Sequence, residues 1–114
     1  MHELSITNTI VKMIEEECLQ NKVKNPKRII IELGRFTTYS GDSIKMFYEM
    51  LKRESEMLKG SELIIKEIHG MVECRNCKKT SRIDDPIMIF CMHCNSNDVK
   101  IISGKELNIK SITE

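Results

Sequence analysis

The stretches "CRNC" at residues 74–77 and "CMHC" at residues 91–94 are two Cys-x-x-Cys pairs separated by thirteen residues. Two residues between cysteines allow a tight turn in which both sulfurs face one ion, and the second turn completes a tetrahedron. The spacing therefore predicts a closed zinc site. Its ligands are expected to be Cys74, Cys77, Cys91 and Cys94. Asn95 follows the second pair, where left-handed backbone is often needed, and asparagine tolerates that conformation well.

Four thiolates around Zn(II) leave about two units of negative charge, which nearby basic side chains can offset. These are Arg75, Lys78, Lys79 and Arg82. The segment 71–98 is short of aliphatic residues, so we expect the metal, rather than a hydrophobic core, to order it. A full tetrahedron has no open position, which predicts a structural role. An iron–sulfur cluster or a redox-active dithiol is the alternative for the same cysteines.

Two histidines lie near this module, His69 before it and His93 inside the second pair. Four well-spaced cysteines leave no vacancy for them in a tetrahedral site, so we expect both to be exposed or hydrogen-bonded around it. The fifth cysteine, Cys18, falls on an apolar helical stripe and is expected to be a buried thiol.

Outside the module, apolar spacing and breakers predict the regular elements. We expect a helix over residues 4–20, whose apolar stripe includes Leu19, and a strand over residues 27–36 with a bend at Gly34. A second helix is expected from Ile44 to Gly60. Further strands are expected over residues 61–70 and, as one or two strands, over residues 99–112.

This order predicts an α/β fold, more narrowly α+β, with two helices packed on a small three-stranded sheet. A zinc-ribbon-like module is inserted before the last strand. The expected organisation is an α/β domain over residues 1–70, the zinc-binding module over residues 71–98, and final strands over residues 99–114 that return to the first domain.

Composition limits the function classes. The 114 residues carry a formal net charge of +1 and few aromatic side chains, which argues against nucleic acid or an anionic membrane as a partner. The chain has no apolar run long enough for a membrane span and no secretory signal at its start, so we expect a cytoplasmic protein. We find no serine–histidine–acid set or phosphate loop, and expect no enzymatic activity.

The chain start "MHE" could chelate a metal. The Met1 amine, the deprotonated His2 amide and the His2 imidazole Nδ1 would form a five-membered and then a six-membered ring around one ion. The Glu3 backbone nitrogen or carboxylate could fill a fourth position, and planar nitrogen-rich geometry suits Ni(II) or Cu(II). A histidine at position 2 is most often just a solvated residue, so these residues alone are a weak signal for a metal site.

Three pieces in this order, "MHELS" at residues 1–5, the two cysteine pairs, and "GKELNIKSI" at residues 104–112, resemble the HypA/HybF family. Its members are nickel metallochaperones for [NiFe]-hydrogenase maturation. The resemblance implies that His2 is the principal nickel ligand, assisted by the Met1 amine and by the backbone or side chain of Glu3. It also implies that the four cysteines hold structural zinc.

The resemblance further implies a HypB-type GTPase and the [NiFe]-hydrogenase large-subunit precursor as partners, and urease maturation proteins in some organisms. Whether Asp42 approaches nickel is left open, and capping of the second helix is its expected role. Two other classes compete: a zinc-ribbon nucleic-acid-binding or regulatory protein, and a thiol oxidoreductase that uses one Cys-x-x-Cys pair.

Overall fold

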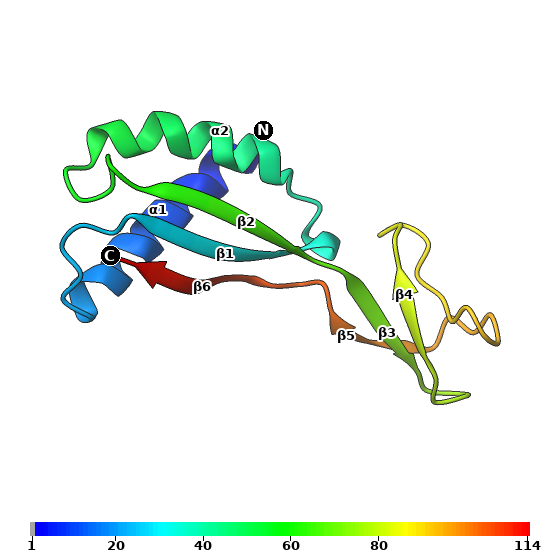
Figure 1. The fold of residues 1–114 in the computed structure, drawn as a ribbon. Helices are drawn as coiled ribbons and strands as arrows, with labels where there is room; N and C mark the ends of the chain where they lie inside the picture. Colours follow the sequence, from blue (N-terminus) through cyan, green and yellow to red (C-terminus); the bar gives the residue numbers. More distant parts are fainter. Residues whose placement is uncertain (1) are drawn as a thin grey trace. The chain divides into compact units, whose positions relative to one another are not determined.

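The computed structural model describes residues 2–114, and the side chains of residues 3–114. In this part of the chain, no helix is long and apolar enough to cross a membrane. The elements are labelled in Figure 1. In chain order they are α1 (His2–Gln20), β1 (Arg28–Gly34), the 3-10 helix η1 (Arg35–Thr37), α2 (Gly41–Leu51), the 3-10 helix η2 (Lys52–Glu54), β2 (Glu62–Ile68), β3 (Gly70–Cys74), β4 (Thr80–Ile83), β5 (Val99–Ser103) and β6 (Leu107–Thr113).

The chain divides into two compact units. The first comprises the chain up to Glu32, Tyr39–Lys66 and Asn108–Glu114, and the second comprises Leu33–Thr38 and Glu67–Leu107.

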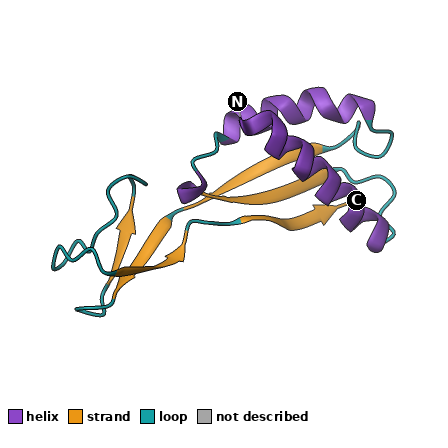
Figure 2. Ribbon diagram, turned by 180° about the vertical axis from the view of Figure 1, so that it is seen from behind, coloured by secondary structure: helices purple, strands orange, loops and turns teal. Residues whose placement is uncertain are grey.

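The first unit is built on a three-stranded sheet with the order β2-β1-β6. Both helices cover the same face of this sheet, as Figure 2 shows. Apolar side chains from the helices meet those of the central strand, and burying them supplies the main stabilisation of the unit. The prediction of two helices on a small three-stranded sheet is confirmed. The buried core consists of Ile10, Ile14, Cys18, Ile29, Ile31, Ile44, Tyr48, Leu58 and Leu63.

Helix α1 is amphipathic because apolar side chains recur every fourth residue. Ile10, Ile14 and Cys18 are fully buried on this stripe, as expected. Leu19 was assigned to the same stripe, and this is wrong, since its side chain is 68% exposed. The helix begins at His2, two residues earlier than predicted.

Helix α2 begins at Gly41, three residues earlier than predicted, and ends at Leu51. The prediction that it continues to Gly60 is wrong. The Ser55 hydroxyl accepts a hydrogen bond from the Leu58 backbone N–H at 3.2 Å, which stabilises a turn in place of the next helical hydrogen bond. Leu58 is nevertheless fully buried, so this apolar residue belongs to the core although it lies outside α2.

The second unit is built on a sheet with the order β4-β3-β5, in which both pairs are antiparallel. Val72 and Ile83 are buried here beside two of the cysteines. The expectation that residues 71–98 contribute no hydrophobic core is therefore only partly right, since two short strands in this segment bury these two aliphatic side chains.

Segment 33–38 is anchored in the second unit by backbone contacts. Gly34 donates to the Glu106 carbonyl at 2.7 Å, and Phe36 donates to the Gly104 carbonyl at 2.8 Å. A Cβ atom on Gly34 would lie 2.0 Å from the Gly104 oxygen. Gly34 itself has ordinary extended backbone, with φ of −74°. Glycine is needed there because two segments of the chain approach each other closely. The strand ends at this residue, and η1 follows directly.

Candidate metal centre

The two cysteine pairs form turns with the same hydrogen-bond pattern. In the first, Lys78 N–H donates to the Cys74 carbonyl at 2.9 Å, and in the second, Asn95 N–H donates to the Cys91 carbonyl at 2.8 Å. Lys78 and Asn95 both have left-handed backbone, with φ of 67° and 64°. The expectation for Asn95 is confirmed. Lys78 was missed, although it occupies the same position after its cysteine pair.

A further backbone hydrogen bond closes the base of each turn. The Cys74 N–H donates to the Lys79 carbonyl at 2.9 Å, and the Cys91 N–H donates to the Ser96 carbonyl at 2.8 Å. In the first turn, β3 ends at Cys74, so the strand holds the first ligand while the turn brings Cys77 back towards it. The two turns thus present their sulfurs from rigid backbone.

The four sulfurs converge. All four Sγ atoms lie within 4.8 Å of one another, and this is the only His/Cys/Asp/Glu group of metal-binding geometry among the described residues. The Cys74–Cys94 and Cys77–Cys91 sulfur pairs are each 3.6 Å apart. Four sulfurs at the usual zinc–sulfur bond length would be separated by about 3.8 Å. The arrangement therefore fits a tetrahedral Zn(II) ion, and 3.6 Å is too long for a disulfide.

Backbone N–H groups point at the sulfurs and favour their ionised form. Burial opposes ionisation of Cys91, but N–H donation from Cys94 and His93, together with the neighbouring thiols, lowers its pKa to about 6. The Cys77 N–H is the largest cause of a lowered pKa at Cys74. A bound divalent cation would favour the remaining thiolates in the same way.

Some of the basic side chains that were predicted to offset the thiolate charge form ion pairs with carboxylates. Arg75 contacts Asp98 at 3.0 Å, and Arg82 contacts Asp84 at 3.0 Å. Lys78 and Lys79 are exposed beside the first turn. Two of the four basic side chains thus have carboxylate partners, so they offset less of the thiolate charge than the sequence suggested.

The other candidate residues lie outside this cluster. The His93 Nε2 atom lies 3.1 Å from the Thr80 carbonyl oxygen, which orients the ring along β4. His69 is exposed at the start of the second unit's sheet. Cys18 is fully buried in the first unit, and burial raises the pKa of its thiol, as expected for a structural cysteine.

The start of the chain is described only in part. Met1 and the side chain of His2 lie outside the described residues, so their predicted roles stay predictions. The backbone of His2 opens α1. The Glu3 carboxylate accepts a hydrogen bond from the Ser40 N–H at 3.1 Å, and this bond is the main cause of its lowered pKa. The loop before α2 therefore lies against the first turn of α1.

Asp42 does not cap α2. The N-cap is Ser40, whose hydroxyl accepts from the Ser43 N–H at 3.2 Å. Asp42 is the second residue of the helix and is exposed, where its carboxylate interacts favourably with the helix dipole. The expected capping role is wrong because "YSGDS" offers a second cap residue two positions earlier.

The family model described as "Hydrogenase/urease nickel incorporation, metallochaperone, hypA" matches residues 1–113. Curated relatives include the hydrogenase maturation factor HypA of Campylobacter jejuni, 32% identical over 109 residues that cover 96% of this chain and 95% of the relative. The HypA of Trichormus variabilis is 34% identical over 112 residues, covering 98% and 94%.

Among solved structures, the Ni metallochaperone HypA from Helicobacter pylori aligns with a TM-score of 0.71 over 98% of this chain and 96% of that one. Its sequence identity to this chain is 23%. The likeness therefore shows the fold alone.

Proposed function

The chain belongs to the HypA family of nickel metallochaperones for hydrogenase maturation, and from that premise we propose that it carries Ni(II) at its amino terminus, with His2 as the principal ligand. The Met1 amine and the backbone or side chain of Glu3 complete the proposed ligand set. The observation that carries this proposal is a histidine directly after the chain's first residue, in a chain that matches the family model from residue 1.

Chelation geometry supports this assignment. An amine, an amide nitrogen and an imidazole from two consecutive residues close two small rings around one ion, a donor set that suits Ni(II). The N–H groups in the first turn of a helix have no acceptor within the helix, so the His2 amide can lose its proton to a metal without breaking a helical hydrogen bond.

Such a site is suited to transfer. Ligands drawn from two or three residues at the end of a chain can be replaced one by one by another protein's ligands, while the folded core stays intact. The amine, the amide and the imidazole must all be deprotonated, so nickel affinity falls as pH falls through the histidine range. Cu(II) would bind the same donors more tightly, so selectivity must come from metal supply and docking.

Zn(II) in the cysteine cluster has a different role. Cys74, Cys77, Cys91 and Cys94 would hold it with all four positions filled, so it supplies folding free energy, on the order of 10 kcal/mol in small zinc modules. We propose that the second unit, which contains the cysteine cluster, is architectural, and that the first unit forms the nickel-binding part.

Hydrogenase maturation implies partners. We propose a HypB-type GTPase and the [NiFe]-hydrogenase large-subunit precursor, and in some organisms urease maturation proteins. We also propose a reducing compartment such as the cytoplasm, because the cysteine cluster requires thiols. The family is one of metallochaperones and not of enzymes.

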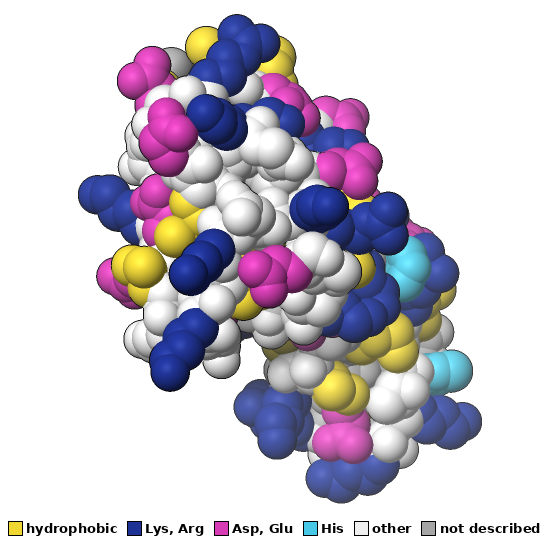
Figure 3. Space-filling model, turned by 60° about the vertical axis from the view of Figure 1, so that its left-hand side comes forward, with side chains coloured by type: hydrophobic (Ala, Val, Ile, Leu, Met, Phe, Trp, Pro, Cys, Tyr) yellow, Lys and Arg dark blue, Asp and Glu magenta, His cyan; other side chains and the backbone are white. Residues whose placement is uncertain are grey.

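The two competing functions receive less support. On the face drawn in Figure 3, basic and acidic side chains are interspersed, unlike the basic stripe of a nucleic-acid-binding surface. A thiol oxidoreductase would need one pair free of metal, whereas all four sulfurs converge on one point.

The test is nickel titration of zinc-loaded His2→Ala, with His93→Ala as the matched control. We expect His2→Ala to lose nickel binding, and His93→Ala to bind one Ni(II) like the parent chain. Both variants should keep one zinc and the same circular dichroism spectrum. Retention of the planar nickel spectrum by His2→Ala would place the site elsewhere.

A further inference from the structure

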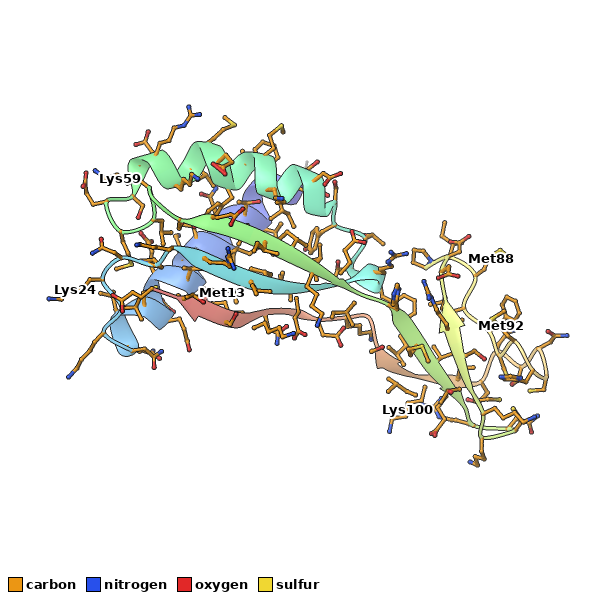
Figure 4. All side chains as sticks on the ribbon, viewed as in Figure 1. Met13, Lys24, Lys59, Met88, Met92 and Lys100 are labelled. Carbon is orange, nitrogen blue, oxygen red and sulfur yellow. The ribbon has the colours of Figure 1, made fainter. Side chains whose placement is uncertain are left out.

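A groove runs between the second half of α1 and strand β6 in the first unit. It consists of two adjacent hollows of about 190 and 250 Å³. Glu17 and Ile109 line both hollows, so the two hollows adjoin each other. Met13, labelled in Figure 4, lies on the helical wall where α1 crosses the strand.

Strand β6 is the edge of its sheet. In the order β2-β1-β6 it pairs with β1 on one side only, and no other strand of the described residues pairs with its outer side. Figure 1 shows β6 along the margin of the first unit. An edge strand offers unpaired backbone N–H and C=O groups that can bind another extended chain. The groove lies along this strand.

The walls have a defined chemistry. Val23, Ile109 and Ile112 supply apolar surface. The helix side carries Glu16 and Glu17. Glu17 contacts the Asn21 side chain at 3.3 Å, whereas Glu16 is exposed and has no ion-pair partner in the described part of the chain. Two carboxylates of α1 therefore line the groove.

We propose that this groove binds an extended segment of another protein, which pairs with β6 as an added strand. An apolar side chain of the segment enters the hollow lined by Val23, Ile109 and Ile112. A lysine or arginine two residues away along the segment, and so on the same face of the added strand, lies beside Glu16 and Glu17. Strand addition at an edge beside a helix is a recurring mode of peptide recognition, in which backbone bonds give affinity and pockets give selectivity.

A second copy of the chain is a poorer occupant. If two β6 strands paired antiparallel about a two-fold axis, Lys110, the middle residue of Leu107–Thr113, would face its own copy. Lys110 already lies against Lys66, which lowers its pKa. Like charges at the centre of the strand disfavour self-pairing, and a lysine at a sheet edge commonly has this effect.

The experiment uses the full, zinc-loaded chain and a fluorescein-labelled hexapeptide with valine at its first and fifth positions, lysine at its third and threonine elsewhere, so that valine and lysine share one face. The same peptide with glutamate in place of lysine is the comparison. Fluorescence anisotropy measures binding, and ¹⁵N chemical shifts locate it. The basic peptide should bind more tightly than the acidic one, shifting amides of β6 and of α1 after Met13. Methylation of alternate peptide nitrogens along one edge should abolish binding, because it removes the donors that pair with β6.

The key variant is Glu16→Lys, and its matched control is Glu54→Lys, an identical charge reversal at an exposed residue outside the groove. Glu16→Lys should lower the affinity for the basic peptide about fivefold, which is the effect of losing one exposed ion pair. Glu54→Lys should change this affinity less than twofold. His2→Ala should bind the peptide normally, which separates this proposal from the nickel site.

Four outcomes would overturn the proposal, of which three concern where and how binding occurs. The first is equal binding of the acidic and basic peptides, and the second is chemical shift changes confined to residues outside the groove. The third is dimerisation of the peptide-free chain in which the amides of β6 become protected from hydrogen exchange. Absence of binding at millimolar peptide would count against it equally.

Discussion

Lys78 and Asn95 occupy the same place after the two cysteine pairs, and both have left-handed backbone. Asparagine at this position was predicted from its tolerance of positive φ, but lysine has no such tolerance, so nothing in its side chain signals the conformation. The signal lay in the repeat of the Cys-x-x-Cys pattern. Any residue at that offset must adopt the turn that brings the second sulfur back.

Replacing Lys78 with glycine should therefore stabilise the zinc-loaded protein. The left-handed conformation costs a lysine roughly 1 kcal/mol, which glycine avoids. We expect the free energy of unfolding in guanidinium chloride to rise. The control Lys79→Gly, next in sequence and without positive φ, should lower it by roughly 0.5–1 kcal/mol. Equal destabilisation by both variants would show that the turn imposes no strain on Lys78.

Before zinc binds, the four cysteine thiols should not all be protonated at neutral pH. Cys91 has a pKa of about 6, so its thiolate is present above that pH and is lost as pH falls below it. Zinc binding at pH 7 should accordingly release fewer than four protons, and the number should approach four at pH 5. Titration calorimetry in buffers of different ionisation enthalpy measures this count. Release of four protons at both pH values would contradict the lowered pKa.

At the scale of elements, the boundaries were less predictable than the elements themselves. Apolar periodicity located both helices and the strands of the first unit, because their buried faces repeat. The ends of α2 depended on Ser40 and Ser55, whose side chains bond to nearby backbone. Serine is common in both loops and helices, so the sequence alone did not reveal which serines act as caps. Strands β3 and β4 were missed because each buries only one or two apolar side chains.

The cap of α2 can be tested directly. Ser40→Ala removes the acceptor for the Ser43 N–H and should lower the free energy of unfolding by about 1 kcal/mol. Ser40→Asn keeps a capping oxygen and should stay close to the parent chain. Thermal unfolding followed by circular dichroism measures both. If alanine and asparagine behave alike, the hydroxyl of Ser40 contributes nothing to the helix.

At the scale of the whole molecule, the two units of the chain are stabilised in different ways. The first unit is held by an apolar core, whereas the second has three buried aliphatic side chains, Leu33, Val72 and Ile83, and a four-sulfur cluster. The cysteine spacing predicted the cluster, because it specifies the turns. The anchoring of residues 33–38 in the second unit was not predictable, since it depends on close approach between Gly34 and Gly104.

Cys74→Ala should show that zinc stabilises the second unit while the apolar core stabilises the first. Without this thiolate we expect zinc to be lost and amide hydrogen exchange to accelerate in β3, β4 and β5, while α1 and α2 keep their protection. Hydrogen exchange and zinc analysis on the same sample provide the measurement. Full zinc occupancy in this variant would contradict the assignment of Cys74 as a ligand.

The central claim is that the free α-amine and His2 together bind a transferable nickel ion. The most direct measurement is Ni(II) titration of the zinc-loaded, untagged chain beside the same chain acetylated at its α-amine, followed by the absorption spectrum of planar nickel. The account predicts one Ni(II) per chain with the free amine and loss of that site after acetylation. Equal nickel binding by both forms would contradict it.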